Sequence, residues 1–225
     1  MELHYHLIRS RKRRRTLSLL IKEDGKIVLH VPYRTPEREI ERFIEERRSW
    51  ICRKLSEKER WIKETEKRFV PEQKFLFLGD WYPLTVEETD QGPPLKLWSG
   101  RFFLMGRHIG DARGIFIRWY QKEAKERISD RSIFFRDRLS LHPKGIKITN
   151  AKHRWGSCTR SDLLCFSWRI IMAPLPVIDY VLVHELVHIK EKNHSKRFWG
   201  YLESILPDYR KRRRWLKENG HLLQI

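Results

Sequence analysis

The feature that most constrains this chain is a strongly apolar segment at residues 177–191, which reads VIDYVLVHELVHIKE. Pro174 and Pro176 precede it, as is typical of the start of a helix. Apolar residues cover nearly every face of the predicted helix, so we expect it to be buried in the middle of a domain. Histidines and a carboxylate on such a helix are costly to bury without a strong partner.

Two histidines of this segment have the spacing of a metal site. His184 and His188 are four residues apart, so a helix presents both imidazoles on one face, in the pattern HExxH. Glu185 follows the first of them and can take a proton from a zinc-bound water, whose pKa the metal lowers to about 7. The plainer alternative is a pair of hydrogen-bonded core histidines with Glu185 paired to a lysine, and the cost of burial favours the metal site.

A third ligand is needed to leave one position open for water. His194 lies six residues after His188, beyond a break in the helix at Asn193. It precedes Ser195, the expected N-cap of the next helix, where the chain can reverse and bring the imidazole back. Glu203 is the competing candidate, since it lies fifteen residues after His188 and resembles the more distant glutamate ligand found in zincins. We expect His194.

Hydrophobic periodicity and turn residues predict an α+β fold. In the first half we expect a hairpin over 17–31 with a turn at Asp24-Gly25, a helix with Thr35 as N-cap, Pro36 as its first residue and an end near Phe69, and strands from Phe75 to Phe103. In the second half we expect a helix over 115–141, strands at 146–149 and 163–171, the apolar helix, and helices beginning after Ser195 and Asp208. The predicted division is a β-rich region at 1–110 with one long helix, followed by a helical domain at 111–225.

Composition indicates which partners and which cellular compartment to expect for the protein. The 225 residues include 48 Lys and Arg against 29 Asp and Glu, a formal net charge of +19. Such an excess favours anionic partners, so nucleic acid is a candidate partner through Arg11 to Arg15 and Arg210 to Arg214, although no nucleic-acid-binding motif accompanies them. The three cysteines include no CxxC pair, and we find no signal-peptide pattern and no apolar run of membrane-spanning length. We therefore expect a cytoplasmic, reduced protein that does not enter membranes. The oligomeric state is not predicted.

Residues outside the histidine pattern have plain structural explanations. Trp155 and Gly156 could approach a bound peptide, but the tryptophans of this region are better explained as core. Cys158 has no matching base, which favours a buried structural thiol. Arg154 and Arg169 could stabilise a developing charge or pair with carboxylates, and both alternatives stay open. Asp179 is typical of a carboxylate in the first turn of a helix.

The chain resembles the YgjP-type metallopeptidases, relatives of the SprT-like zinc proteases. The resemblance covers almost the whole length and is carried by these segments: RWGSC (154–158), SWR (167–169), APLPVIDYVLVHELVHIKEKNHSKRFW (173–199), PDYRKRRRWLKENG (207–220) and, in the N-terminal half, VPYRTPEREIERFIEERRSWI and FLFLGDWYPL. It implies a zincin-like domain with His184, His188 and His194 as zinc ligands and Glu185 as base. One departure is Ser167, where the family commonly has Asn.

The sequence therefore predicts a zinc-dependent hydrolase, and in particular a metallopeptidase that acts on a peptide or protein carbonyl. One alternative is a nucleic-acid-associated protein with a structural zinc, which would require a fourth protein ligand. Another, which the resemblance implies, is a metal-dependent nucleotide pyrophosphatase, although no phosphate-binding GxxxxGK[ST] loop is present.

Overall fold

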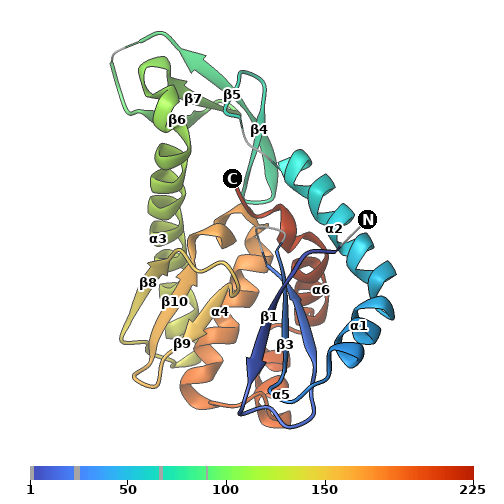
Figure 1. Ribbon diagram of the computed structural model, residues 1–225. Coiled ribbons are helices and arrows are strands. Elements are labelled where there is room, and N and C mark those ends of the chain that lie inside the picture. The colour runs from blue at the N-terminus through green and yellow to red at the C-terminus, as the bar shows by residue number, and fades with distance from the viewer. Residues whose placement is uncertain (1–2, 23–25, 66–67, 90) are drawn as a thin grey trace. The chain divides into compact units, whose positions relative to one another are not determined.

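The computed structural model describes residues 3–22, 26–65, 68–89 and 91–225, with the side chains of 57–65 excepted. It confirms the α+β class, and the chain forms two compact units, Met1–Glu66 and Lys67–Ile225 (Figure 1). The division into a region at 1–110 and a domain at 111–225 stays a prediction. The strands after residue 74 share one hydrophobic core with the C-terminal helices.

The first unit contains a three-stranded sheet in the order β1-β3-β2. Its strands are β1 (Tyr5–Ser10), β2 (Ser18–Ile21) and β3 (Ile27–Pro32). The antiparallel pairing of β2 with β3, in which Leu19 lies opposite Leu29, confirms the predicted hairpin. The expected Asp24-Gly25 turn lies outside the described residues. The parallel pairing of β1 with β3 was not predicted.

The long helix expected in this unit is two helices, α1 (Glu37–Glu45) and α2 (Arg48–Thr65). The prediction of one continuous helix was wrong because the backbone tightens at the junction, where the Arg47 amide donates to the Ile44 carbonyl at 3.1 Å. Pro36 has an extended conformation and is the N-cap residue, so Thr35 is not the cap. Ile40 of α1 is fully buried and packs with Leu29 and Val31 of β3.

The second unit begins with a four-stranded sheet in the order β4-β5-β7-β6, followed by a long helix. These elements are β4 (Lys74–Phe77), β5 (Asp80–Glu87), β6 (Leu95–Trp98), β7 (Arg101–Met105), a 3-10 turn (Gly106–Asp111) and α3 (Ala112–Leu139). An aromatic core joins them: Phe75 stacks on Phe116 with ring centroids 4.2 Å apart, and Tyr120 stacks on Trp168 at 5.8 Å. Among the described residues, no helix combines the length and apolar character that crossing a membrane requires.

The turn between β4 and β5 fixes the chain just before the histidine-bearing helix. The amides of Leu78 and Gly79 donate to the carbonyls of Ile171 and Met172, each at 3.0 Å. Gly79 has φ +94°, and a β-carbon there would lie 2.8 Å from Cγ of Pro174. Only glycine allows both this conformation and this close approach, which accounts for the Gly-Asp turn of the FLFLGDWYPL segment.

The remaining elements include the histidine-bearing helix, against which several of the others pack. They are β8 (Gly145–Thr149), β9 (Gly156–Cys158), β10 (Leu163–Ser167), a 3-10 turn (Trp168–Met172), α4 (Leu175–Lys190), α5 (Lys196–Ile205), α6 (Tyr209–Asn219) and a last 3-10 turn (Gly220–Leu222). The strands form a sheet in the order β8-β10-β9, with β9 at an edge. Helix α4 packs against α3, β9, α5 and α6 (Figure 1).

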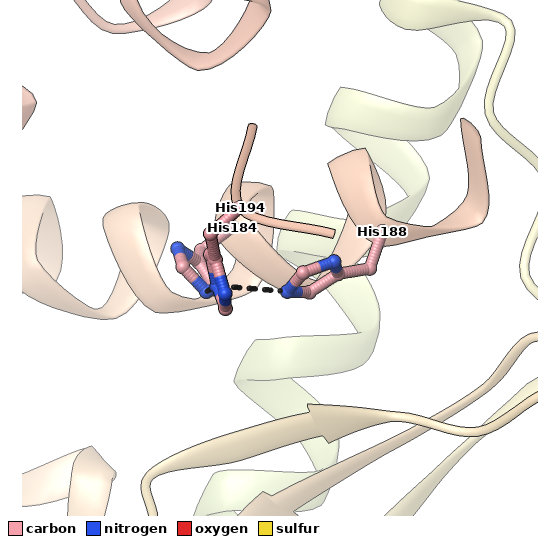
Figure 2. A group of neighbouring side chains, drawn as sticks. All are labelled: His184, His188 and His194. Atoms are coloured by element: carbon pink, nitrogen blue, oxygen red, sulfur yellow. Dashed lines mark hydrogen bonds between the residues drawn. The ribbon is translucent and has the colours of Figure 1, made fainter. Parts of the chain in front are cut away.

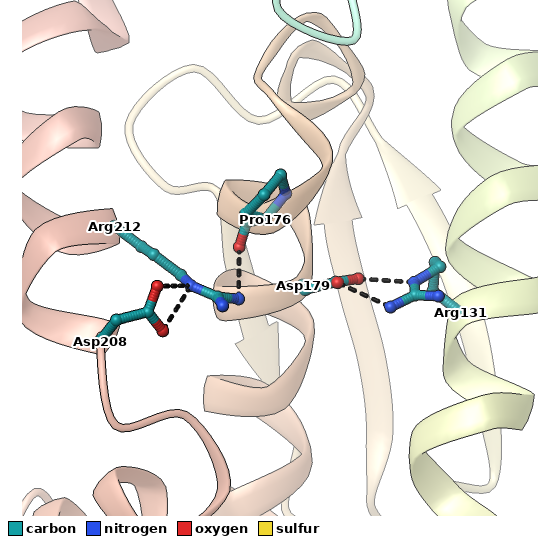
Figure 3. Close-up of polar contacts among 5 residues, drawn as sticks. All are labelled: Arg131, Pro176, Asp179, Asp208 and Arg212. Carbon is teal, nitrogen blue, oxygen red and sulfur yellow. Dashed lines mark hydrogen bonds and ion pairs between the residues drawn. The ribbon is translucent and has the colours of Figure 1, made fainter.

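Two arginines fix the start of α4 from either side, as Figure 3 shows. Arg131 of α3 donates twice to the buried carboxylate of Asp179, with both distances 2.7 Å. Arg212 of α6 donates to Asp208 at 2.9 Å and to the Pro176 carbonyl at 3.0 Å. Asp179 is therefore half of a bidentate ion pair, a contact that its place in the helix could not predict.

Candidate metal centre

Helix α4 is buried along most of its length and presents two imidazoles on one side. Ten of its residues are buried, whereas His184 and His188 are only half-buried. Their ring centroids lie 5.0 Å apart, as expected for residues at positions i and i+4 of one helix. The predicted burial of this helix is confirmed.

The chain reverses after α4 and brings a third imidazole to the first two. Glu191, the C-cap residue, has φ −118° and ends the helix, and the Ser195 hydroxyl caps α5 by accepting from the Phe198 amide. In between, His194 points back, as Figure 2 shows. Its Nε2 lies 3.0 Å from Nε2 of His184 and 3.1 Å from Nε2 of His188.

These distances suit a tetrahedral cation. Metal–nitrogen bonds of about 2.0–2.1 Å place two tetrahedral ligand nitrogens roughly 3.3 Å apart. The three histidines form a group that could hold a metal ion, and among the described residues that group contains no fourth protein ligand. Glu203, the competing third ligand, is exposed and pairs with Arg210 at 3.5 Å.

The surroundings keep the imidazoles in the state that binds metals. Burial, followed by the neighbouring imidazoles and the Arg213 charge, lowers the pKa of His184 to about 3, and burial also lowers the pKa of His194. Nδ1 of His188 lies 3.0 Å from the Glu191 carbonyl, which can accept a hydrogen bond from Nδ1–H and so favours the tautomer with an unprotonated Nε2. Neutral imidazoles are the form that binds metal.

Phe198 packs beneath all three rings, a contact that sequence reasoning missed. Its ring centroid lies 4.9, 4.6 and 4.7 Å from those of His184, His188 and His194, and its side chain is fully buried. The available signal was its position three residues after the Ser195 cap, which turns the first turn of α5 toward α4. Phe198 thus limits the rotation of the imidazoles.

Glu185 packs against strand β9. It is 6% exposed, and its carboxylate accepts a hydrogen bond from the Cys158 backbone amide. Burial raises the pKa of Glu185 to about 7, against the lowering effect of that hydrogen bond. A group with a pKa near neutral can both accept and return a proton at cellular pH.

Gly156 of β9 lies directly against this carboxylate. A β-carbon there would lie 2.6 Å from Cγ, 2.7 Å from Oε1 and 2.9 Å from Cδ of Glu185. The RWGSC segment therefore needs glycine at this position because the Glu185 side chain occupies the space that a methyl group would fill.

We predict that Gly156→Ala lowers hydrolytic activity by on the order of 10²-fold, because the added methyl group displaces the Glu185 carboxylate. Metal content should not change, since the atoms nearest to the added methyl group belong to Glu185 and not to a histidine. The matched control is Gly200→Ala on α5, where a β-carbon meets nothing within 4 Å. The measurements are turnover and zinc content of both variants. Equal activity in the two variants would show that Gly156 does not position the Glu185 carboxylate.

The other sequence candidates do not join the histidine group. Trp168 is a buried core residue, as expected, while Trp155 is partly buried and touches Gly220. Arg169 donates to Asn150 and stacks over Trp168. The thiol of Cys158 is free and its pKa is raised by burial, which disfavours a nucleophilic thiolate.

Comparisons with known proteins identify the family. A search of the curated proteins found no match. Among solved structures, a crystal structure of the metallopeptidase zymogen of Pyrococcus abyssi abylysin shares 19% identity, covering 40% of this chain and 93% of that one with a TM-score of 0.37. A family model described as YgjP-like, metallopeptidase domain, matches residues 15–219. This chain therefore belongs to the YgjP-like family, whose model describes a metallopeptidase domain.

Proposed function

We propose that this protein is a zinc peptidase in which His184, His188 and His194 hold the metal and Glu185 is the general base. The observation that carries the proposal is the convergence of three Nε2 atoms at a helix that also carries a buried carboxylate at the position after His184. Three imidazoles are a typical donor set for catalytic zinc, which keeps one position free of protein ligands. The family's metallopeptidase domain supports a peptidase that uses a metal ion.

Each part of the site has a separate role in hydrolysis. Bound zinc would supply the Lewis acidity that lowers the pKa of water to about 7 and polarises a carbonyl. Glu185 removes a proton from the attacking water, holds it at its carboxylate, and returns it to the leaving amine. Gly156 and the Cys158 amide fix the position of that carboxylate through contact and a hydrogen bond.

Strand β9 offers a place for an extended substrate. It is an edge strand of its sheet, it packs against α4, and its first residue touches Glu185. A peptide that adds to a sheet edge gains main-chain hydrogen bonds and lies parallel or antiparallel to the strand. A scissile peptide bond along β9 would therefore pass beside the Glu185 carboxylate.

Metal dependence of peptide cleavage tests the proposal. The purified protein is stripped with a chelator, reconstituted with one equivalent of zinc, and incubated with a peptide library derived from a whole proteome. New peptide termini, counted by mass spectrometry, should appear with the zinc-loaded protein and fall to background in the stripped one. Cleavage that is equal in both preparations would contradict the proposal. Release of pyrophosphate from nucleoside triphosphates, measured with the same preparations, would favour the nucleotide hydrolase instead.

A further inference from the structure

Helix α6 carries a run of basic residues that differ in their partners. Arg210 pairs with Glu203 at 3.5 Å, and Arg212 pairs with Asp208 at 2.9 Å. Arg213 is exposed, and in the described part of the chain no carboxylate pairs with it. Its charge is therefore available to a ligand.

The position of Arg213 is fixed by an aromatic ring that borders the three histidines. Its guanidinium carbon lies 5.1 Å from the Trp199 ring centroid, a cation–π contact. The Trp199 ring in turn stacks on His194 at 5.6 Å and lies 6.0 Å from the His184 ring. Arg213 is thus one aromatic ring away from the candidate metal centre.

The helical phase of α6 gives the same placement. Tyr209, Arg213 and Leu216 lie at positions i, i+4 and i+7, and the first and last of them are buried. Tyr209 also stacks on Trp199, with centroids 5.5 Å apart. Arg213 therefore leaves α6 next to the face that packs on the rest of the unit, while its side chain stays exposed.

We propose that Arg213 is a specificity-determining residue that binds a carboxylate of the peptide substrate beside the metal centre. The inference rests on the proposed function. A guanidinium matches a carboxylate with two parallel hydrogen bonds, and its contact with Trp199 restrains it before a substrate arrives. Two sources supply this chemistry, an acidic side chain and the C-terminal carboxylate of a short peptide.

Binding of small chelators tests the inference without requiring turnover. The probes are monohydroxamates of succinic, glutaric, adipic and suberic acids, each compared with its methyl ester on the zinc-loaded protein by calorimetry. The hydroxamate reports on the metal, and the distal carboxylate reports on Arg213. We expect the best-fitting acid to bind about three- to tenfold tighter than its ester. Arg213→Gln should abolish that difference and leave ester binding within about twofold, whereas Arg214→Gln on the exposed next position should keep it.

The outcomes separate this inference from the proposed function. Equal binding of acid and ester by the wild-type protein, or a difference that persists in Arg213→Gln, would overturn the role of Arg213. Failure of every hydroxamate to bind the zinc-loaded protein would overturn the proposed metal site, and this inference with it. Melting temperatures of the variants, expected to match the wild type because Arg213 is exposed, exclude misfolding as the cause.

Peptides then distinguish the two sources of carboxylate. One series has an amidated C-terminus and a single Glu placed at successive positions, and the other has a free C-terminus and no acidic residue. The peptide series whose carboxylate binds Arg213 should have a higher kcat/KM than its neutral counterpart. Arg213→Gln should remove this difference in kcat/KM, and Arg213→Glu should reverse it. An advantage that is unchanged in both variants would contradict the assignment.

Discussion

Glu185→Gln should keep a full complement of zinc and lose hydrolytic activity by on the order of 10²–10⁴-fold, the usual contribution of a positioned general base. The glutamine amide fills the same buried space beside Gly156, and its oxygen can still accept from the Cys158 amide. What it cannot do is take a proton from water. Because the three imidazoles come from other positions, the change should leave Nε2 of His194 next to Nε2 of His184 and Nε2 of His188.

The measurement is turnover of any peptide that the wild-type protein cleaves, together with zinc content by elemental analysis. Glu126→Gln, the same change at an exposed position of α3, is the control and should behave as the wild type. Activity within a few-fold of the wild type would show that Glu185 is not the base. Loss of zinc from Glu185→Gln would place this carboxylate among the ligands instead.

Much of the fold and the histidine group could be predicted because the determinants are local. Two histidines four residues apart meet on any helix, and the Ser195 cap lies next to the residue whose reversal it favours. The pairing of β2 with β3 and the buried character of α4 follow from the periodicity of their own residues. Each of these elements carries its own pattern along a short stretch of chain.

The features that escaped prediction depend on contacts between distant segments. Strand β9 has three residues, too few to show an alternating pattern, and it is a strand because it pairs with β10. The contact of Gly156 with Glu185 joins positions that are far apart in the sequence. The ion pair of Asp179 with Arg131 depends on the packing of α3 on α4. No property of the single segments contains these pairings.

Removal of the metal ligands is the second change with a large expected effect. We predict that His184→Ala and His188→Ala each abolish stoichiometric zinc binding, and that His194→Ala weakens it by more than the roughly 10- to 100-fold that follows loss of an outer partner of a ligand. Glu203→Ala should leave zinc affinity unchanged, because this side chain is exposed and pairs with Arg210. The assay is competition with a chromogenic chelator at fixed pH, since protons compete for the imidazoles.

Chemical rescue distinguishes a lost ligand from a disturbed fold. His194 is exposed, so free imidazole can enter the space that His194→Ala creates and replace the missing nitrogen. Added imidazole should therefore restore part of the zinc affinity in His194→Ala and have no such effect in Glu203→Ala. Melting temperatures measured without metal should be close in the two variants, because neither side chain belongs to the hydrophobic core. A large loss of zinc affinity in Glu203→Ala with none in His194→Ala would overturn the assignment of the third ligand, because the imidazole that converges on His184 and His188 would then contribute nothing to binding.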